Sequence, residues 1–498
     1  MTNLASNLTT TAAAHPEQDA LRVSGQGVTY AQLHGMAARV AGALRASGIE
    51  PGDRVAVILP NVPAFPVVYW GILLAGGIVV PMNPLLKAAE INFFFRDSGA
   101  KLAFVWPDFV PEATTGAEGA GTRIVECGAM SPVDGELEPG DPISEPTPRE
   151  DDDTAIILYT SGTTGRPKGA ELTHRNVHLN AHRSASVIQE VTPDDVVMGC
   201  LPLFHVFGLV VGLNAATIAG ASLALIPRFD PAAAIEVIEK ERVTIMQGVP
   251  TMYAAILNHP MSDGMDASSL RTCVSGGSAM PLDVMRSFED KFGCVILEGY
   301  GLSETSPVAS FNMPDRERKP GTIGVAIPGC EMRCVDLDGI DVPVGEVGEI
   351  AIRGDNVMKG YWNNPEATAE AIPDGWFRTG DLATMDEEGY FTIVDRKKDM
   401  ILRGGMNVYP REVEEVIYTH PDVVEVAVVP LPDELLGEQV GAAVALREGS
   451  TATPEEIIDF TRERIAAYKY PRKVWIVPEL PKGPTGKILR REVSAPAQ

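Results

Sequence analysis

An apolar strand that runs directly into a loop of glycines and hydroxyl residues sets the strongest limit on the fold. Residues 155–169 read AIILYTSGTTGRPKG, so an apolar run precedes residues 160–165 and Lys168. Glycines let the backbone approach an anion closely, and successive backbone amides form a concave anion site. The hydroxyls add donors and Lys168 adds a compact positive charge. The segment therefore predicts a phosphate-binding loop at the end of a buried strand.

This loop is not a Walker A loop. That pattern, GxxxxGK[ST], would require glycine in place of Pro167 and serine or threonine in place of Gly169. A turn that binds nothing can also be rich in these residues. Eleven residues of this composition immediately after a strand favour the phosphate site.

Strand and helix patterns alternate in the first 110 residues. Residues 28–42 have apolar positions at helical spacing behind Thr29, a capping residue type. Residues 53–60 and 101–106 are short apolar runs typical of buried strands, and residues 65–84 indicate a helix, a glycine break and a strand. The alternation predicts an α/β fold in which mixed or parallel sheets are layered with helices.

Composition excludes several classes of protein. The 498 residues, 45% apolar and 22% charged, are not those of a disordered, collagen-like or coiled-coil chain. The length exceeds one typical domain of about 100–200 residues, which predicts a large core with an appended domain. Because 41 Lys+Arg face 67 Asp+Glu, the net charge is −26. We therefore expect no nucleic-acid partner, since binding there depends on phosphate neutralisation.

Neither a disulfide framework nor a membrane span is expected. Six cysteines are too few for a scaffold, and the closest pair, Cys330 and Cys334, lacks the CxxC spacing of zinc sites. Residues 1–16 lack a basic head and an apolar stretch, so we expect a cytoplasmic location. Residues 196–227 contain no charged side chain, but proline and glycines interrupt them, which predicts a strand, a loop, a buried helix, a turn and a second strand at 221–226. Peripheral contact with a membrane stays open.

The charge changes sign at the C-terminus. Residues 461–498 contain nine Lys/Arg and three Asp/Glu, a balance of +6, which leaves −32 for residues 1–460. This segment either meets an anion or docks against the acidic remainder of the chain, and composition alone does not choose between the two.

Eight motifs together resemble the adenylate-forming superfamily of acyl-CoA synthetases, peptide-synthetase adenylation domains and luciferases. They follow the family's order along nearly the whole chain: YTSGTTGRPKG (159–169), LPLFHVFG (201–208), VSGGSAMP (274–281), EGYGLSET (298–305), GEVGEIAIRG (345–354), WFRTGD (376–381), VDRKKDMILRGGMNVYPREVE (394–414) and PKGPTGKILR (481–490).

The resemblance implies two half-reactions. A carboxylate first attacks the α-phosphate of ATP, giving an acyl-adenylate and pyrophosphate, and a thiol then displaces AMP. Lys487 matches the catalytic lysine, which bridges carboxylate and phosphate. Glu304 matches the magnesium-linked carboxylate, with Thr160 as a second metal contact, and one carboxylate suffices because Mg²⁺ also takes phosphate and water oxygens. ATP, Mg²⁺ and coenzyme A are the implied cofactors and cosubstrates.

The implied nucleotide site spans several motifs. Tyr300 would stack on adenine, and Asp381 and Arg396 would contact the ribose. Ser303 stands where many relatives have threonine, and its hydroxyl can still reach the α-phosphate. The full set implied for ATP or AMP is Thr160, Ser161, Gly162, Thr163, Thr164, Gly165, Lys168, Gly276, Glu298, Gly299, Tyr300, Gly301, Ser303, Asp381 and Arg396.

The resemblance also divides the chain. Residues 1–395 correspond to the large AMP-binding domain, 396–399 to a hinge at Lys398, and 400–498 to a small, mobile α+β lid that carries the catalytic lysine. Gly405 would line the pantetheine channel, and Lys469 and Arg472 would meet the phosphates of coenzyme A.

His205 bears on the acid that is activated. Amino-acid-activating relatives usually carry an aspartate in this motif, and without it a substrate ammonium would be buried unpaired, which disfavours amino acids. By resemblance His205 is a catalytic residue beside the substrate carboxylate. His205, Phe207, Gly277 and Ser278 would line an apolar acyl tunnel, which predicts a medium- or long-chain fatty acid. Aryl acids stay open, and so does malonate, which would need an inward cation such as Arg228 or Arg271.

Three rival readings stay open. The acceptor of the acyl group could be an acyl carrier protein rather than coenzyme A, or the enzyme could be a light-emitting oxidase. A non-catalytic nucleotide-binding scaffold is disfavoured because Lys487 and Glu304 are both present. His174, His178 and His182 recur every four residues, but no carboxylate or thiol completes a metal site, so we expect a polar helix face. The sequence does not indicate an oligomeric state.

Overall fold

In the computed structural model residues 1–395, which we call the body, are built around two large sheets. The structure describes residues 3–132, 136–160, 166–433, 435–484 and 486–496. Within them the first sheet has the strand order β18 (Gly360–Tyr361), β8 (Lys168–Thr173), β7 (Thr154–Thr160), β4 (Ile78–Pro81), β3 (Arg54–Ile58), β5 (Leu102–Val105) and β6 (Arg123–Glu126). The second has the order β15 (Val325–Ala326), β14 (Val308–Phe311), β13 (Val295–Gly301), β12 (Thr272–Ser275), β11 (Ile245–Gly248), β9 (Val196–Gly199), β10 (Ser222–Leu225), β1 (Asp19–Val23) and β2 (Gln26–Thr29).

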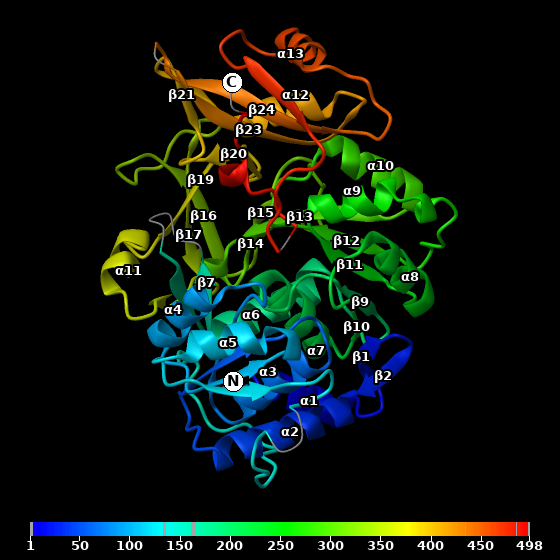
Figure 1. Cartoon of the computed structure of the whole chain (residues 1–498), viewed down its shortest axis with the longest axis vertical. Helices are drawn as coiled ribbons and strands as arrows, with labels where there is room; N and C mark the ends of the chain where they lie inside the picture. Colours follow the sequence, from blue (N-terminus) through cyan, green and yellow to red (C-terminus); the bar gives the residue numbers. More distant parts are fainter. Residues whose placement is uncertain (1–2, 133–135, 161–165, 434, 485, 497–498) are drawn as a thin grey trace.

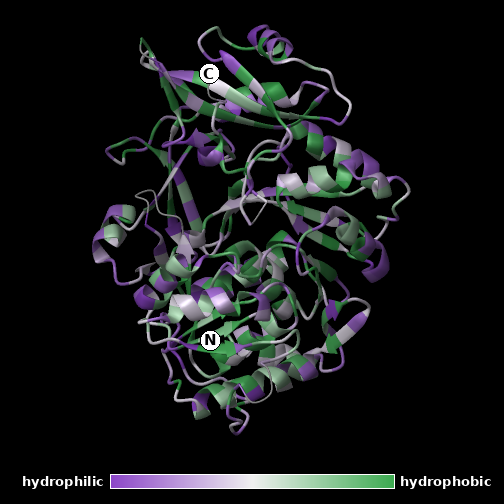
Figure 2. Ribbon diagram, viewed as in Figure 1, coloured by the Kyte–Doolittle hydropathy of each residue, from purple (hydrophilic) through white to green (hydrophobic). Residues whose placement is uncertain are grey.

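Helices cover the faces of both sheets, as buried parallel strands require. The body helices are α1 (Ser6–Ala14), α2 (Tyr30–Ala46), α3 (Ala64–Leu74), α4 (Ala88–Ser98), α5 (Val110–Ala117), α6 (His174–Arg183), α7 (Ala215–Ala219), α8 (Pro231–Glu241), α9 (Pro250–Asn258), α10 (Leu282–Phe292) and α11 (Pro365–Ala371). Figure 2 shows hydrophobic residues concentrated on the inner strands and hydrophilic residues on the outer helix faces. The expected α/β fold with layered mixed and parallel sheets is confirmed.

Two smaller sheets complete the molecule. One has the order β16 (Cys330–Val335), β17 (Gly348–Gly354), β19 (Phe377–Met385) and β20 (Phe391–Arg396). The other has the order β22 (Met406–Val408), β21 (Ile401–Arg403), β24 (Gly437–Leu446) and β23 (Val423–Asp433), with β25 (Lys473–Val477) also on β24. Helices α12 (Pro410–Tyr418) and α13 (Pro454–Arg462) pack with this last sheet around a core of its own residues. We call residues 400–498 the lid.

The chain runs from the bottom to the top of the molecule in Figure 1. The N-terminal elements lie at the bottom, and the orange and red lid lies at the top. After β25 a red segment descends from the lid into the centre, and the C-terminus lies back at the top beside the lid strands, where Val493 and Ala495 pack on the lid. This arrangement brings Pro484 and residues 487–490 to the cavity that strands of the second sheet also line.

Local patterns explain most of the elements. Thr29 caps α2 and forms a capping box with Gln32, although the helix begins at Tyr30 because Val28 and Thr29 belong to β2. The 196–227 run folds as β9, the π-helical turn Phe207–Asn214, α7 and β10. In the part of the chain that the structure describes, no helix is long and apolar enough to cross a membrane.

Candidate active site

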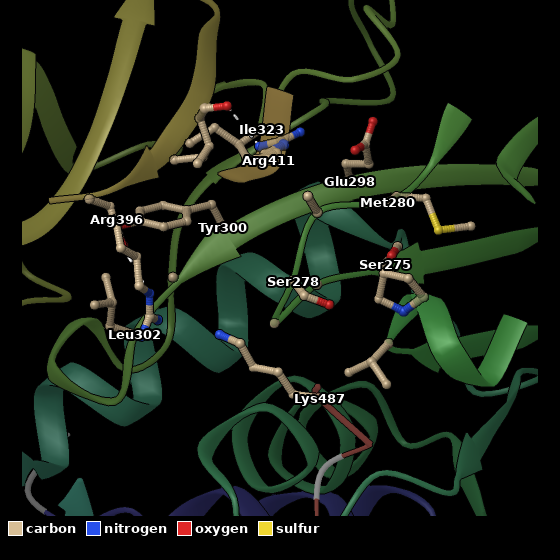
Figure 3. A pocket seen from close by; sticks show the side chains of 18 of the residues that line it. Ser275, Ser278, Met280, Glu298, Tyr300, Leu302, Ile323, Arg396, Arg411 and Lys487 are labelled. Atoms are coloured by element: carbon tan, nitrogen blue, oxygen red, sulfur yellow. Dashed lines mark hydrogen bonds and ion pairs between the residues drawn. The ribbon is translucent and has the colours of Figure 1, made fainter. Parts of the chain in front are cut away.

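A cavity of about 2030 Å³ lies where the body meets the lid. Its volume exceeds the roughly 300–1,000 Å³ of a typical small-molecule site, so it has room for more than one ligand. Figure 3 shows Tyr300 and Arg396 on one side, Glu298 and Met280 on the other, and Lys487 pointing into the space between them. The described residues of the predicted site that line it are Thr160, Lys168, His205, Phe207, Gly276, Gly277, Ser278, Glu298, Gly299, Tyr300, Gly301, Ser303, Glu304, Asp381, Arg396, Lys398 and Lys487. The loop residues Ser161, Gly162, Thr163, Thr164 and Gly165 lie outside the described residues.

The buried carboxylate of Glu304 lies beside the end of β7. Its Oε1 accepts hydrogen bonds from the Thr160 hydroxyl at 3.2 Å and the Tyr361 hydroxyl at 3.0 Å. Burial raises the pKa of Glu304, and among the described residues no lysine or arginine forms an ion pair with it. Lys168, at the start of β8, lies 5.1 Å from the centre of the Tyr361 ring. A carboxylate and a hydroxyl that share a buried site without a cation fit a divalent metal ion.

Asp381 joins Tyr300 and Arg396 on the opposite wall. Its Oδ2 accepts a 2.6 Å hydrogen bond from the Tyr300 hydroxyl, and its Oδ1 lies 3.3 Å from Arg396 Nε. Asp381 and Arg396 are direct cross-strand partners on β19 and β20, which explains why two motifs 15 residues apart meet. Each carboxylate oxygen has two lone pairs, so Asp381 can still accept bonds from sugar hydroxyls.

Two glycines at the carboxyl ends of β12 and β13 lie close to their neighbours. A Cβ on Gly301 would lie 1.9 Å from the Pro307 carbonyl oxygen, and one on Gly276 would lie 3.1 Å from the Phe207 ring. The buried Glu298 accepts a 2.8 Å bond from the Gly321 amide, and burial raises its pKa to about 7. These strand ends and Tyr300 line the same cavity.

Lys487 reaches the cavity from the lid. Burial, followed by the positive charge of Arg396, lowers its pKa to about 8, while Asp381 acts in the opposite direction. At pH 7 the ammonium is therefore still mostly protonated, but it is poorly compensated by the protein. An anionic ligand beside it would restore the pKa and gain a strong charge-assisted contact.

His205 is neutral in this environment. The ring is half-buried at the edge of the cavity. Burial, followed by the nearby positive charge of Lys487, lowers the pKa of His205 to about 4. Its Nδ1 accepts a 3.3 Å bond from the Phe207 amide, which leaves Nε2 as the protonated nitrogen. His205 can therefore donate one hydrogen bond to a carboxylate oxygen in the cavity.

Family models match both parts of the chain. Residues 8–362 match the model of the AMP-binding enzyme, and residues 412–487 match that of the AMP-binding enzyme C-terminal domain. The chain belongs to the AMP-binding enzyme family. The resemblance seen in the motifs and the expected class, an AMP-forming acid–thiol ligase, are thereby confirmed.

Two relatives of this AMP-binding enzyme cover it almost completely. A feruloyl-CoA synthase of Amycolatopsis sp is 41% identical over 96% of this chain and 96% of its own length. A long-chain-fatty-acid–CoA ligase of Bacillus subtilis (strain 168) is 37% identical over 98% and 94%.

A solved relative, MatB from Rhodopseudomonas palustris, is 34% identical in sequence. Its ATP-bound structure superposes with a TM-score of 0.90 over 99% of this chain and 98% of MatB. Its apo structure covers the same shares with a TM-score of 0.80. The AMP-binding enzyme described here is thus more similar to the ATP-bound arrangement.

The three residues predicted for coenzyme A do not line the cavity. Gly405 lies in the exposed turn between β21 and β22. Lys469 forms ion pairs with both oxygens of Glu412, at 2.6 and 2.7 Å, and Arg472 packs on the Tyr470 ring. In this arrangement of the lid they are separate from Lys487, and their role stays a prediction.

Two of the three histidines after the loop contact the N-terminal residues, and His182 instead interacts with Ser186 and the His178 ring. His174 Nδ1 accepts a 2.9 Å bond from the Leu4 amide, and His178 Nδ1 lies 3.0 Å from Asn7 Oδ1. No group of three or more candidate metal ligands occurs in the described ranges. The histidines belong to a polar helix face that packs on the first residues of the chain.

Sequence reasoning missed three residues of the site. Tyr361 holds Glu304, Thr251 donates a 2.9 Å bond to the Gly486 carbonyl beside Lys487, and Arg490 packs against Asp395. Tyr361 follows the GEVGEIAIRG motif by only seven residues, and a search beyond the motif edges could have identified it. Thr251 belongs to no motif, so only the fold reveals its role.

Proposed function

We propose that this enzyme is an ATP-dependent carboxylic acid–CoA ligase. The acid's carboxylate oxygen attacks the α-phosphorus of ATP, the bond to the β-phosphate breaks, and acyl-adenylate and pyrophosphate form. The sulfur of coenzyme A then attacks the acyl carbon, and AMP leaves. The observation that carries this proposal is the poorly compensated Lys487 ammonium, which shares one cavity with Asp381, Arg396 and His205.

The residues of the cavity divide the work of adenylation between them. Asp381 and Arg396 would hold the ribose, and the strand ends with Tyr300 would hold adenine. Lys487 would lie between the carboxylate and the α-phosphate, where negative charge gathers in the transition state. His205 Nε2 would orient the carboxylate, and since no protein nucleophile is required, catalysis is positioning and charge stabilisation.

Glu304 and Thr160 would hold Mg²⁺ together with phosphate oxygens. When bound, the ion would neutralise charge on the phosphates of ATP. The buried Glu304 carboxylate, with its raised pKa and hydroxyl partners, supports this assignment. The chain's own part is to keep this carboxylate in place, which Thr160 and Tyr361 do.

The lid would serve the two steps in turn. We divide the chain into the body at 1–395, the hinge at 396–399 and the lid at 400–498, and Lys398 lines the cavity at that hinge. With Lys487 inserted, the arrangement suits adenylation, and a rotation would bring Gly405 and its neighbours towards the acyl-adenylate. Lys469 and Arg472 would meet coenzyme A only after that rotation.

We propose a medium- or long-chain fatty acid as the substrate. The cavity wall beyond His205 is apolar, with Ile188, Val211, Val249 and Val274. Arg271, an inward cation considered for malonate, is held by Asp195 at 2.8 Å and does not line the cavity. Neither does Arg228, which is exposed, so these two arginines give no support to malonate.

One observation favours an aryl acid as a second candidate. The Ser275 hydroxyl lines the cavity, is buried, and has no hydrogen-bond partner among the described residues. An unpaired buried hydroxyl is costly, and a polar group on the substrate would satisfy it. A hydroxylated aromatic ring offers such a group, as a saturated chain does not, and a relative at 41% identity is a feruloyl-CoA synthase.

A panel of acids tests both candidates. The purified chain receives ATP, Mg²⁺ and one acid at a time (C6 to C18 fatty acids, benzoate, ferulate, malonate), with and without coenzyme A. AMP and acyl-CoA should rise together for one class. Ser275→Ala should lower turnover of ferulate but not of a fatty acid if the aryl candidate holds.

The other outcomes are equally informative. If pyrophosphate is released but no thioester forms, the acceptor of the acyl group is an acyl carrier protein rather than coenzyme A. If neither product forms with any acid, the ligase assignment is wrong, and a non-catalytic nucleotide-binding scaffold becomes the favoured function.

A further inference from the structure

Arg490 lies where the Lys487 segment returns to the junction between body and lid. It follows Lys487 by three residues, and its guanidinium faces three carboxylates. Nη1 lies 3.3 Å from Asp395 Oδ1 and 3.7 Å from Asp399 Oδ2, and Nε donates a 2.9 Å bond to Glu414 Oε1. Burial favours loss of the proton, but the carboxylates outweigh burial and raise the pKa of Arg490.

The three carboxylates belong to different parts of the proposed division. Asp395 lies on β20 of the body and is only 2% exposed, Asp399 lies in the hinge, and Glu414 lies on α12 of the lid. A rotation of the lid about Lys398 would carry Arg490 and Glu414 together and leave Asp395 behind. Asp399 follows Lys398 in the sequence and would move with the lid, so of these three contacts the one with Asp395 depends on the orientation of the lid.

Asp395 receives a second group from the lid. The Arg411 backbone amide, at the start of α12, donates a 2.9 Å bond to Asp395 Oδ2. One body carboxylate thus binds the beginning of the first lid helix and the end of the lysine segment. Because Asp395 is buried, its release from both lid groups would leave its charge less compensated, which favours the arrangement seen here.

Arg490 lies only three positions after Lys487, and backbone hydrogen bonds tie this stretch to the residues just before it. The Leu489 amide donates to the Pro481 carbonyl at 2.8 Å, and the Gly483 amide donates to the Lys487 carbonyl at 2.8 Å. Three residues span at most about 10 Å, so a fixed Arg490 confines Lys487 to the cavity region. Thr251 of the body holds the other side through its 2.9 Å bond to the Gly486 carbonyl.

We propose that Arg490 is a positioning residue, which fixes Lys487 for adenylation through its contact with Asp395 across the hinge. When the contact with Asp395 opens, the Arg490 guanidinium stays paired with Glu414, which belongs to the lid as well. The lid can therefore turn without leaving Arg490 unpaired. The inference rests on the proposed function. It assigns Arg490 to the first half-reaction only.

Separate assays of the two half-reactions test this role. Adenylation is followed as pyrophosphate release from acid, Mg²⁺ and ATP without coenzyme A, and thioester formation is followed from supplied acyl-adenylate and coenzyme A. Arg490→Gln should lower kcat for adenylation by at least about tenfold, as loss of a charge-assisted contact predicts, with little change in KM for ATP. Thioester formation should be retained, and Arg490→Lys should restore part of the adenylation rate.

Further variants separate positioning from folding. Arg353→Gln, which removes an exposed arginine from its pair with Glu331, is the matched control and should change neither step. Thr251→Val removes only the bond to Gly486 and, like Arg490→Gln, should lower the rate of adenylation. In a double-mutant cycle, Arg490→Gln and Asp395→Asn should be strongly non-additive, because both variants remove the Arg490–Asp395 contact. Equal loss of both half-reactions in Arg490→Gln, additive effects, or no loss would overturn the proposal.

A readout without substrates distinguishes this proposal from the proposed function. If the wild-type chain activates no acid, the ligase assignment fails, and hydrogen exchange of the free protein then decides the role of Arg490. Amides of residues 481–491 should exchange faster in Arg490→Gln than in the wild type, while β23 and β24 stay unchanged. Unchanged exchange in 481–491 would overturn the role.

Discussion

The nucleotide wall of the body and the lid place their predicted residues very differently. In the body, side chains from β7, β13, β19 and β20 converge on one cavity, although up to 236 residues separate Thr160 from Arg396. In the lid, Lys487 reaches the cavity, whereas Gly405, Lys469 and Arg472 lie elsewhere. The described residues predicted for the nucleotide therefore meet at one cavity of the body, whereas only one of the four predicted lid residues lies at that cavity.

The charges of the two regions differ as well. In the body, Glu304 and Glu298 are buried carboxylates whose pKa burial raises, which suits cationic or hydrogen-bonding ligands. In the lid, Lys469 and Lys482 of the basic C-terminal segment already pair with Glu412 and Glu425. The positive balance of that segment is thus partly compensated within the lid, while Lys487, Arg464, Arg490 and Arg491 of the same segment line the cavity.

The largest expected effect separates the two half-reactions. Lys487→Ala should lower adenylation by about 10²–10³-fold, the cost of removing one group that stabilises developing charge. Thioester formation from supplied acyl-adenylate should change little, because the role proposed for Lys487 is in the pyrophosphate-forming step. Both rates are measured in the same preparation. Equal loss of both would place Lys487 outside the role proposed here.

The pH dependence sharpens the contrast between the charged lysine and the body. The pKa of Lys487 in the free protein is lowered to about 8. In the role proposed for it, the protonated form would be the active one. Adenylation kcat/KM should therefore be flat below this value and fall about 30-fold by pH 9.5, since kcat/KM reports the free enzyme. Arginine stays protonated over this pH range, so the residual activity of Lys487→Arg should not fall between about pH 8 and pH 9.5. A flat wild-type profile to pH 9.5 would contradict the assignment.

A change in the lid turn should affect the second step alone. Gly405 has φ +81°, and a Cβ there would meet no neighbour, so Gly405→Ala strains the backbone without a clash. We expect thioester formation to fall about five- to tenfold and adenylation to stay unchanged, because an L-residue resists this conformation. Gly449→Ala, also at φ +81° and in open space, is the matched control and should leave both steps intact. A fall in adenylation would mean that the turn already serves the first step.

The sequence predicted what local patterns encode and missed what long-range packing creates. Helix α2 and strands β3 and β5 follow from periodicity, and motif residues such as Asp381 and Arg396 lie in the cavity as expected. The contact of Arg490 with Asp395 spans 95 residues, and no local pattern contains it. Helix α1 was also missed, since its Thr/Ala-rich residues form a helix by packing on α2 and α7 rather than by a strong periodicity.

The smallest expected effect concerns Tyr361, which holds Glu304 and which the motifs did not include. Tyr361→Phe removes the hydroxyl that donates the 3.0 Å bond to Glu304 but keeps the ring beneath Lys168. Loss of one such bond should lower adenylation about two- to fivefold and raise the Mg²⁺ concentration needed for half-maximal rate.

Tyr390→Phe is the matched control for this change. The Tyr390 hydroxyl also donates one bond, to the Glu317 carbonyl, and Lys319 lies 4.3 Å from its ring, yet it does not line the cavity. The control should therefore keep the Mg²⁺ dependence of the wild type. If both variants shift it equally, Tyr361 stabilises the fold rather than the carboxylate. If only Tyr361→Phe shifts it, the Tyr361 hydroxyl supports the Glu304 carboxylate in binding the cation.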